Sequence, residues 1–203
     1  MNKLIIKSLI EETKGRKIVC ITKYVQEDEM IELLSYGLND FGENRVNDFI
    51  RKYNNLKDYN IVWHFVGHLQ KNKCDKIIDK IDYLHSLDSL ELAYLINKRR
   101  VKPLDCFIEL KLVSNNSKYG VTLDRLDDFM NKIKTLDKIN VIGFMAMSDK
   151  GMSDDEISSI FNKANELKNK YGLSELSMGM SDDYKIALKN GTTYLRLGRI
   201  LFS

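Results

Sequence analysis

Short hydrophobic runs alternate along this chain with longer segments in which hydrophobic residues recur at helical spacing. Buried parallel strands are predicted for eight runs, at residues 18–22, 40–42, 61–66, 83–86, 106–112, 141–147, 175–178 and 193–197. Strict alternation of strand and helix indicates a parallel sheet, and eight repeats favour a closed (β/α)8 TIM barrel. An open, doubly wound sheet is the alternative fold.

Helices are predicted between these runs. The clearest is a stripe of hydrophobic residues at positions 157, 160, 161, 164 and 167, preceded by Ser153 and Glu156 at the spacing of a capping box. Further helices are expected near residues 3–13, over 122–135 and over 181–190. The last should open with Ser181, Asp182 and Asp183, where the helix dipole favours negative charge.

Length and composition agree with a single domain spanning 1–203. The 203 residues divided by eight units leave about 25 residues for each strand, helix and pair of turns. No hydrophobic run approaches the roughly 20 residues needed to span a bilayer, and the N-terminus shows no secretory signal. Three scattered cysteines suggest reduced thiols in the core, so we expect a cytoplasmic protein.

The charges argue against a nucleic-acid-binding protein. Lys and Arg number 32 against 29 Asp and Glu, and the two signs are interleaved along the chain. A small anionic ligand remains possible. Neither a GxGxxG nor a GxxxxGK[ST] motif follows the first predicted strand, which weakens dinucleotide-binding and P-loop interpretations.

In a barrel the functional face lies at the carboxyl ends of the strands, where this chain places a coherent set of polar residues. Lys23 follows the first strand. A lysine in this position is either a solvated loop residue or an amine at the barrel mouth that can form a Schiff base with a carbonyl compound.

The last two strands carry the signals of an anion site. Ser181 stands at a predicted helix start and Gly198 and Arg199 follow the last strand, where TIM barrels frequently bind phosphate. Arg196 lies within a hydrophobic strand, so it needs either an internal ion pair or a ligand. By contrast, His64 alternates with Trp63 and Phe65, which predicts a hydrogen-bonded core histidine.

Assembled in order, these segments resemble the pyridoxal phosphate (PLP) homeostasis proteins, whose barrel is similar to the N-terminal domain of alanine racemase. The resemblance covers residues 18–202 and is carried by ITK at 21–23, FGEN at 41–44, WHFVGHLQKNK at 63–73, SKYGV at 117–121, GFMAM at 143–147, LSMGMSDD at 176–183 and RLGR at 196–199.

The resemblance implies a role for each candidate residue. Lys23 would hold PLP as a Schiff base, with Asn44 beside the cofactor. Arg196 would face the pyridine nitrogen and keep it unprotonated, which weakens the ring as an electron sink. Ser181 and the backbone amides of Gly198 and Arg199 would bind the phosphate.

Three departures from the family pattern are visible. Arg199 replaces the threonine that the family commonly has at this position, so a hydroxyl contact to phosphate is lost while the backbone amide remains. The segment before Lys23 is short, and little of a final helix follows the last strand. We expect these two shortened segments to affect the stability of the fold more than the binding of PLP.

The favoured function is that of a monomeric, cytoplasmic PLP carrier or buffer without robust catalysis, whose partners include PLP-dependent apo-enzymes but neither nucleic acid nor membrane. Racemisation needs a second acid or base, which related enzymes draw from a C-terminal β-domain, and we expect none here after Ser203. The alternatives are a minimal PLP-dependent racemase or lyase that uses Lys23 as its base, and a barrel enzyme that forms a Schiff base between Lys23 and a phosphorylated substrate.

Overall fold

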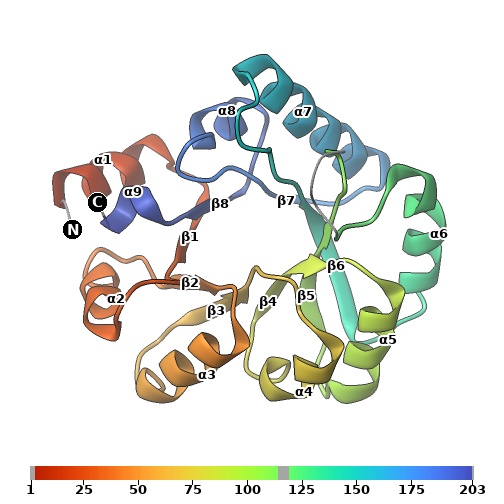
Figure 1. The fold of residues 1–203 in the computed structure, drawn as a ribbon, viewed down its shortest axis with the longest axis horizontal. Coiled ribbons are helices and arrows are strands. Elements are labelled where there is room, and N and C mark those ends of the chain that lie inside the picture. The colour runs from red at the N-terminus through yellow and green to blue at the C-terminus, as the bar shows by residue number, and fades with distance from the viewer. Residues whose placement is uncertain (1–2, 114–118, 203) are drawn as a thin grey trace.

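The computed structural model of the chain describes residues 3–113 and 119–202 and confirms the predicted TIM barrel. Parallel strands follow one another in chain order around a closed ring, and the last pairs with the first (Figure 1). The strands are β1 (Lys17–Ile21), β2 (Asp40–Glu43), β3 (Val62–Phe65), β4 (Tyr83–Leu87), β5 (Leu104–Glu109), β6 (Ile139–Met145), β7 (Glu175–Ser177) and β8 (Tyr194–Leu197).

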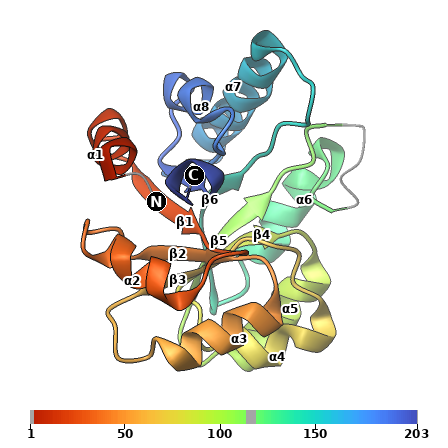
Figure 2. The ribbon, with the colours of Figure 1, turned by 60° about the vertical axis from the view of Figure 1, so that its left-hand side comes forward.

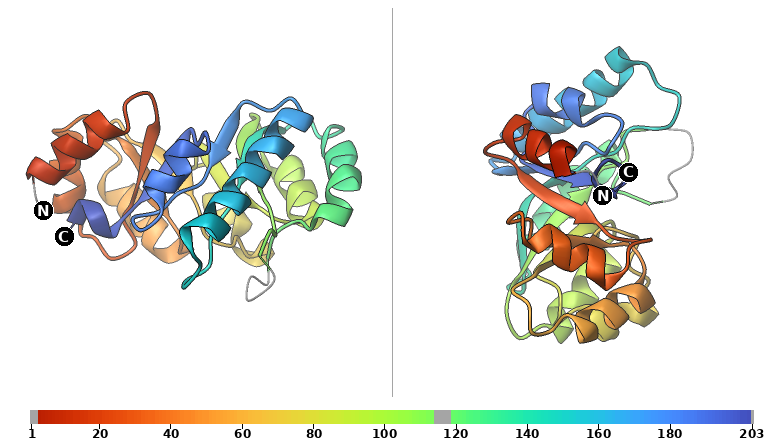
Figure 3. Two further views of the ribbon diagram at one scale, coloured as in Figure 1. Left: turned by 90° about the horizontal axis from the view of Figure 1, so that it is seen from above. Right: turned by 90° about the vertical axis from the view of Figure 1, so that its left-hand side faces the viewer.

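The helices surround this ring, as Figures 1 and 2 show. They are α1 (Lys3–Glu12), α2 (Glu27–Leu34), α3 (Val46–Asn55), the short 3-10 helix η1 (Lys71–Lys73), α4 (Cys74–Ile77), α5 (Leu90–Arg99), α6 (Leu123–Ile133), α7 (Asp154–Lys170), α8 (Tyr184–Lys189) and α9 (Arg199–Phe202). Helices α1 and α9, from opposite ends of the chain, lie side by side (Figure 3). Over the described part of the chain, no helix has both the length and the hydrophobicity needed to cross a bilayer.

Helix α7 shows how the sequence pattern becomes packing. Ser153 and Glu156 form the predicted capping box, which satisfies the first free amides of the helix. The buried stripe of Ile157, Phe161 and Ala164 then faces the sheet. The main hydrophobic core therefore lies between the strands and the ring of helices.

Two predicted boundaries are wrong in ways that matter for the site. The fifth strand ends at Glu109 instead of continuing to residue 112. The predicted helix 181–190 is shorter, because residues 181–183 form a turn and α8 begins at Tyr184. Asp183 does not cap that helix with its side chain. It is buried, and its carboxylate accepts hydrogen bonds from the Met180 amide (2.5 Å) and Ser148 Oγ (2.5 Å).

Candidate functional site

A cavity of about 510 Å³ lies at the carboxyl ends of the strands. Its lining comes from the segments after β1, β2, β3, β5, β6, β7 and β8, although these segments are far apart in sequence. The structure brings all six predicted site residues to this one cavity: Lys23, Asn44, Ser181, Arg196, Gly198 and Arg199.

Lys23 lies in a tight turn directly after β1. The turn is closed by a hydrogen bond from the Val25 amide to the Thr22 carbonyl (2.9 Å). The lysine side chain is exposed, and its Nζ lies 5.2 Å from the ring centroid of Tyr24. Lys23 is thus both a solvated loop residue and part of the cavity wall. Its side chain is not buried at the barrel mouth.

The loops after β7 and β8 meet at Ser181. Its Oγ accepts hydrogen bonds from the backbone amides of Gly198 (3.4 Å) and Ile200 (3.3 Å). Two amides and a hydroxyl that converge in this way can bind an anion. The amide of Ile200 is a donor that sequence reasoning missed. The Arg199 guanidinium pairs with Asp182 at the rim, where both side chains are 76% exposed.

Gly179 gives the β7 loop its sharp bend. Its φ of +93° lies in the left-handed region, and a Cβ there would come within 2.6 Å of the Ala187 Cβ. Only glycine fits this bend, which brings Ser181 back over the end of β8. The glycine of the LSMGMSDD segment is therefore a geometric requirement of the turn that carries Ser181.

Arg196 is 5% exposed and held by neutral partners. Its guanidinium donates to the Ser177 carbonyl (2.6 Å), Ser177 Oγ (2.7 Å) and the Ala146 carbonyl (3.1 Å). Among the described residues, Arg196 forms no ion pair, which was one of the two alternatives considered for it from the sequence. Burial lowers the pKa of Arg196 to about 10, and the more distant Asp183 and Glu109 oppose this shift. Arg196 remains a cation facing the cavity.

A chain of hydrogen bonds extends from Arg196 through the barrel interior. Ser177 Oγ contacts His85 Nδ1 (2.7 Å), His85 Nε2 contacts His64 Nδ1 (2.9 Å), and His64 Nε2 contacts Asp40 Oδ1 (2.9 Å). Burial lowers the pKa of both histidines, most strongly that of His85, so both rings are neutral.

The direction of this chain is fixed by its ends. Arg196 can only donate and the Asp40 carboxylate can only accept, so each neutral histidine carries its proton on Nε2 and the Ser177 hydroxyl donates to His85. The chain holds the guanidinium of Arg196 in place from below. His64 is confirmed as a hydrogen-bonded core histidine.

Two further titratable residues, Glu109 and His68, line the cavity, and sequence reasoning missed the first of them. Glu109 lines the wall, and burial raises its pKa to about 7, with a further contribution from Asp88 that Arg196 opposes. It was overlooked because the fifth strand was predicted to continue beyond it. His68, from the segment after β3, donates its Nδ1–H to Asp88 Oδ2 (2.7 Å) and stacks on Tyr119 at 3.6 Å between ring centroids.

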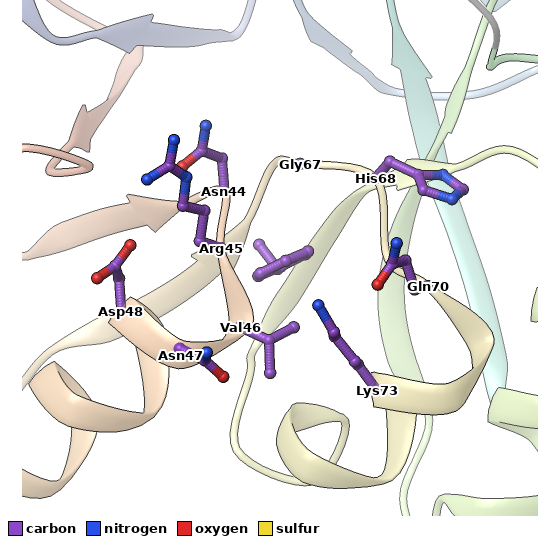
Figure 4. Close-up of a pocket in the computed structure, with 10 residues that line it drawn as sticks. Asn44, Arg45, Val46, Asn47, Asp48, Gly67, His68, Gln70 and Lys73 are labelled. Atoms are coloured by element: carbon purple, nitrogen blue, oxygen red, sulfur yellow. The ribbon is translucent and has the colours of Figure 1, made fainter.

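Asn44 connects this cavity to a second, larger one of about 690 Å³ (Figure 4). The larger cavity shares Asn44, Gly67 and His68 with the first, but its lining comes only from the segments after β2 and β3. It also contains Arg45 and Lys73, whose side chains extend from opposite sides in Figure 4. The convergence of strand ends therefore favours the smaller cavity as the functional site.

Comparison with known proteins agrees with the motifs. Residues 5–203 match the family described as "Alanine racemase, N-terminal domain". The chain is 34% identical to the pyridoxal phosphate homeostasis protein of Aquifex aeolicus, over 92% of this chain and 86% of that protein. The chain belongs to the family of PLP homeostasis proteins, whose fold is that of the alanine racemase N-terminal domain. Further members with that name include one from Synechocystis (32% identical, 92% and 90% covered) and one from Escherichia coli K12 (30%, 91% and 84%).

Solved structures share the architecture of this chain. PipY of Synechococcus elongatus, 28% identical, superposes with a TM-score of 0.93 without PLP and 0.91 with PLP bound, over 98% of this chain and 99% of PipY. Alanine racemase of Corynebacterium glutamicum, 15% identical, superposes at 0.75 over 98% of this chain and 59% of the racemase. The latter likeness concerns the fold alone. The family motif residues Ser117 and Lys118 lie outside the described residues.

Proposed function

We propose that this chain binds PLP as a Schiff base on Lys23 and buffers or delivers it within the cytoplasm, as a monomer. The observation that carries this proposal is the single cavity in which an exposed lysine, a buried arginine and a serine with two convergent amides meet. A Schiff base needs an amine, a phosphate needs convergent donors, and a pyridine nitrogen accepts from a fixed N–H.

The residues fit the cofactor group by group. Ser181, with the amides of Gly198 and Ile200, suits the phosphate, and the Arg199 amide, predicted from the sequence, lies in the same loop. Arg196, fixed from below, suits the ring nitrogen. The buried Asn44 Oδ1 has no hydrogen-bond partner among the described residues, and Asn44 lines the same cavity. The family membership and the PLP-bound PipY structure support the same proposal.

We propose delivery of the cofactor, as opposed to catalysis, because the site is open to solvent. Lys23 is exposed, so water and acceptor molecules reach the position of the Schiff base. The relatives are named as homeostasis proteins and not as enzymes. We therefore propose that PLP-dependent apo-enzymes receive the cofactor and that the chain turns over no substrate efficiently.

Borohydride reduction followed by peptide mass spectrometry tests the attachment site. Loaded protein should be yellow, lose this colour on reduction and carry the adduct on Lys23. A Lys23→Ala variant should form no adduct, whereas Lys102→Ala, at an exposed lysine that does not line the cavity, should react normally. An adduct of undiminished yield in Lys23→Ala would contradict the assignment.

One observation favours the second candidate, a PLP-dependent racemase or lyase with Lys23 as base. Glu109, with its pKa raised to about 7, and the stacked pair of His68 and Tyr119 line the cavity and could transfer a proton. Incubation with each L-amino acid followed by chiral chromatography separates the two functions. Rapid turnover that Lys23→Ala abolishes would establish the enzyme in place of the carrier.

A further inference from the structure

A buried ion pair lies directly beneath the turn that carries Lys23. Lys52, from the last full turn of α3, is 1% exposed, and Glu43, at the end of β2, is 0% exposed. The Lys52 ammonium donates to Glu43 Oε1 and also to the backbone carbonyl of Thr22. Thr22 Oγ1 donates to the same carboxylate oxygen (2.6 Å). Sequence reasoning assigned no role to any of these three residues.

The contact of Lys52 with Thr22 connects the buried ion pair to the turn that carries Lys23. The Thr22 carbonyl accepts from Lys52 and also from the Val25 amide, the hydrogen bond that closes the turn over Lys23 and Tyr24. The Thr22 amide in turn donates to the Gly42 carbonyl (3.1 Å). The backbone of Thr22, the residue that precedes Lys23, is therefore held from β2 through its amide and from α3 through its carbonyl.

Stability alone is a poor explanation for this arrangement. Removing a carboxylate and an ammonium from water costs several kcal/mol per ion, and well-packed hydrophobic residues often stabilise such a site as well or better. Here Glu43 Oε2 is buried and accepts no hydrogen bond from the described residues, so the pair is not even fully compensated. A buried polar network with an uncompensated carboxylate oxygen calls for a role other than stability.

We propose that Lys52, Glu43 and Thr22 are positioning residues that set the reactivity of Lys23 toward an aldehyde, an inference that rests on the proposed function. In that reaction the neutral amine of Lys23 adds to the aldehyde carbon. The C=N bond forms, the C=O bond is lost, and the oxygen leaves as water with the two amine protons. The reaction needs the flexible lysine to be directed at the carbon, and a fixed turn reduces the angles it must search.

A double variant, Lys52→Met with Glu43→Gln, removes both charges without leaving one unpaired. Two measurements are made on it: the rate of Schiff base formation with PLP, and the affinity for pyridoxine 5′-phosphate, which has no aldehyde. We expect the rate to fall roughly tenfold to hundredfold, while the affinity for the analogue stays within about threefold of the wild type. The hydrogen bonds of Arg196 and Ser181 are made with residues of the β6, β7 and β8 ends and do not involve the two substituted residues. Analogue binding should therefore survive.

A matched control separates positioning from general destabilisation. Phe161→Ala creates a cavity in the main core beneath α7, so it should lower the Tm and leave the rate of capture unchanged. If the double variant does not fold, Thr22→Val takes its place, since it removes only the hydroxyl donor to Glu43. We expect it to slow capture a few-fold, roughly, and Thr22→Ser to restore the rate.

The outcomes are distinct. Capture at the wild-type rate in the folded variants would overturn the inference, and so would a loss of capture matched by an equal loss of analogue affinity. If wild-type protein forms no adduct on Lys23, the proposed function itself fails and the inference fails with it. Slowed capture with retained analogue binding, and an unaffected Phe161→Ala control, is the result we expect.

Discussion

The two sides of the cavity differ in how firmly they hold their functional groups. On the β7 and β8 side, Arg196 is fixed by three hydrogen bonds and Ser181 by two amides. On the β1 and β2 side, Lys23 projects into solvent from a turn whose backbone is fixed. In the proposed function the first side would be a rigid receptor for an anion and a ring nitrogen, whereas the second would present an exposed nucleophile on a fixed turn.

This difference indicates that noncovalent binding and covalent capture are separable properties. A rigid receptor lowers the entropy lost on binding, while an exposed lysine lets the covalent bond form and hydrolyse. A protein that stores and releases a cofactor needs both. Three predictions test the comparison, from the largest expected effect to the smallest.

The first concerns two arginines that lie three residues apart in sequence. Arg196→Met should lower the free energy of unfolding by about 3 kcal/mol, because it leaves the buried oxygens of Ser177 and Ala146 without their donor. Arg199→Met, at the exposed rim pair, should cost about 0.5 kcal/mol or less. Urea denaturation of both variants measures the difference, and equal losses would contradict the picture of a rigid side.

The second addresses the phosphate loop. Ser181→Ala should weaken binding of pyridoxine 5′-phosphate about tenfold, because a hydrogen bond to a charged group is lost. The attachment site on Lys23 should stay the same. Calorimetric titration gives the affinity, with Ser174→Ala, an exposed serine just before β7, as the control. Unchanged affinity in Ser181→Ala would remove this loop from the proposed phosphate site.

The third is a pH effect on the same binding. Because burial raises the pKa of Glu109 to about 7, this side chain gains a negative charge as the pH rises through neutrality. A charge across a hydrated cavity opposes an anionic ligand by roughly 0.7 kcal/mol, or about threefold in affinity. The ratio of affinities of Glu109→Gln and wild type should therefore rise between pH 6 and pH 8, which titrations at several pH values would measure. A constant ratio would contradict the shifted pKa.

Much of the site was predictable because strand ends in a barrel converge. Lys23, Asn44, Ser181 and Arg196 were recognised as polar residues at those ends, and the closed ring brings them to one cavity. Glu109 was missed because hydrophobic residues continue past the true end of β5, where hydrophobicity alone marks no boundary. The Ile200 amide was missed because backbone donors leave no trace in a residue pattern.

Other features depend on neighbours that sequence spacing does not reveal. Arg196 could equally have formed an ion pair, and only the position of Ser177 on the adjacent strand shows that its partners are neutral. Lys52 directly follows the exposed Arg51 on α3, and nothing in the local sequence predicts its burial against Glu43. Its contacts with Thr22 and Glu43 exist only because α3 packs against the ends of β1 and β2.

The sequence by itself determined the number and order of strands, because burial on both faces of a parallel sheet requires hydrophobic runs at regular intervals. It also indicated that Lys23, Asn44, Ser181 and Arg196 reach the mouth of the barrel. Only the tertiary structure decided how these groups are held: the chain of hydrogen bonds from Arg196 to Asp40, the convergence of amides on Ser181 and the buried pair below Lys23. Hydrogen bonds act over about 3 Å, so they depend on packing distances that no pattern of residue types records.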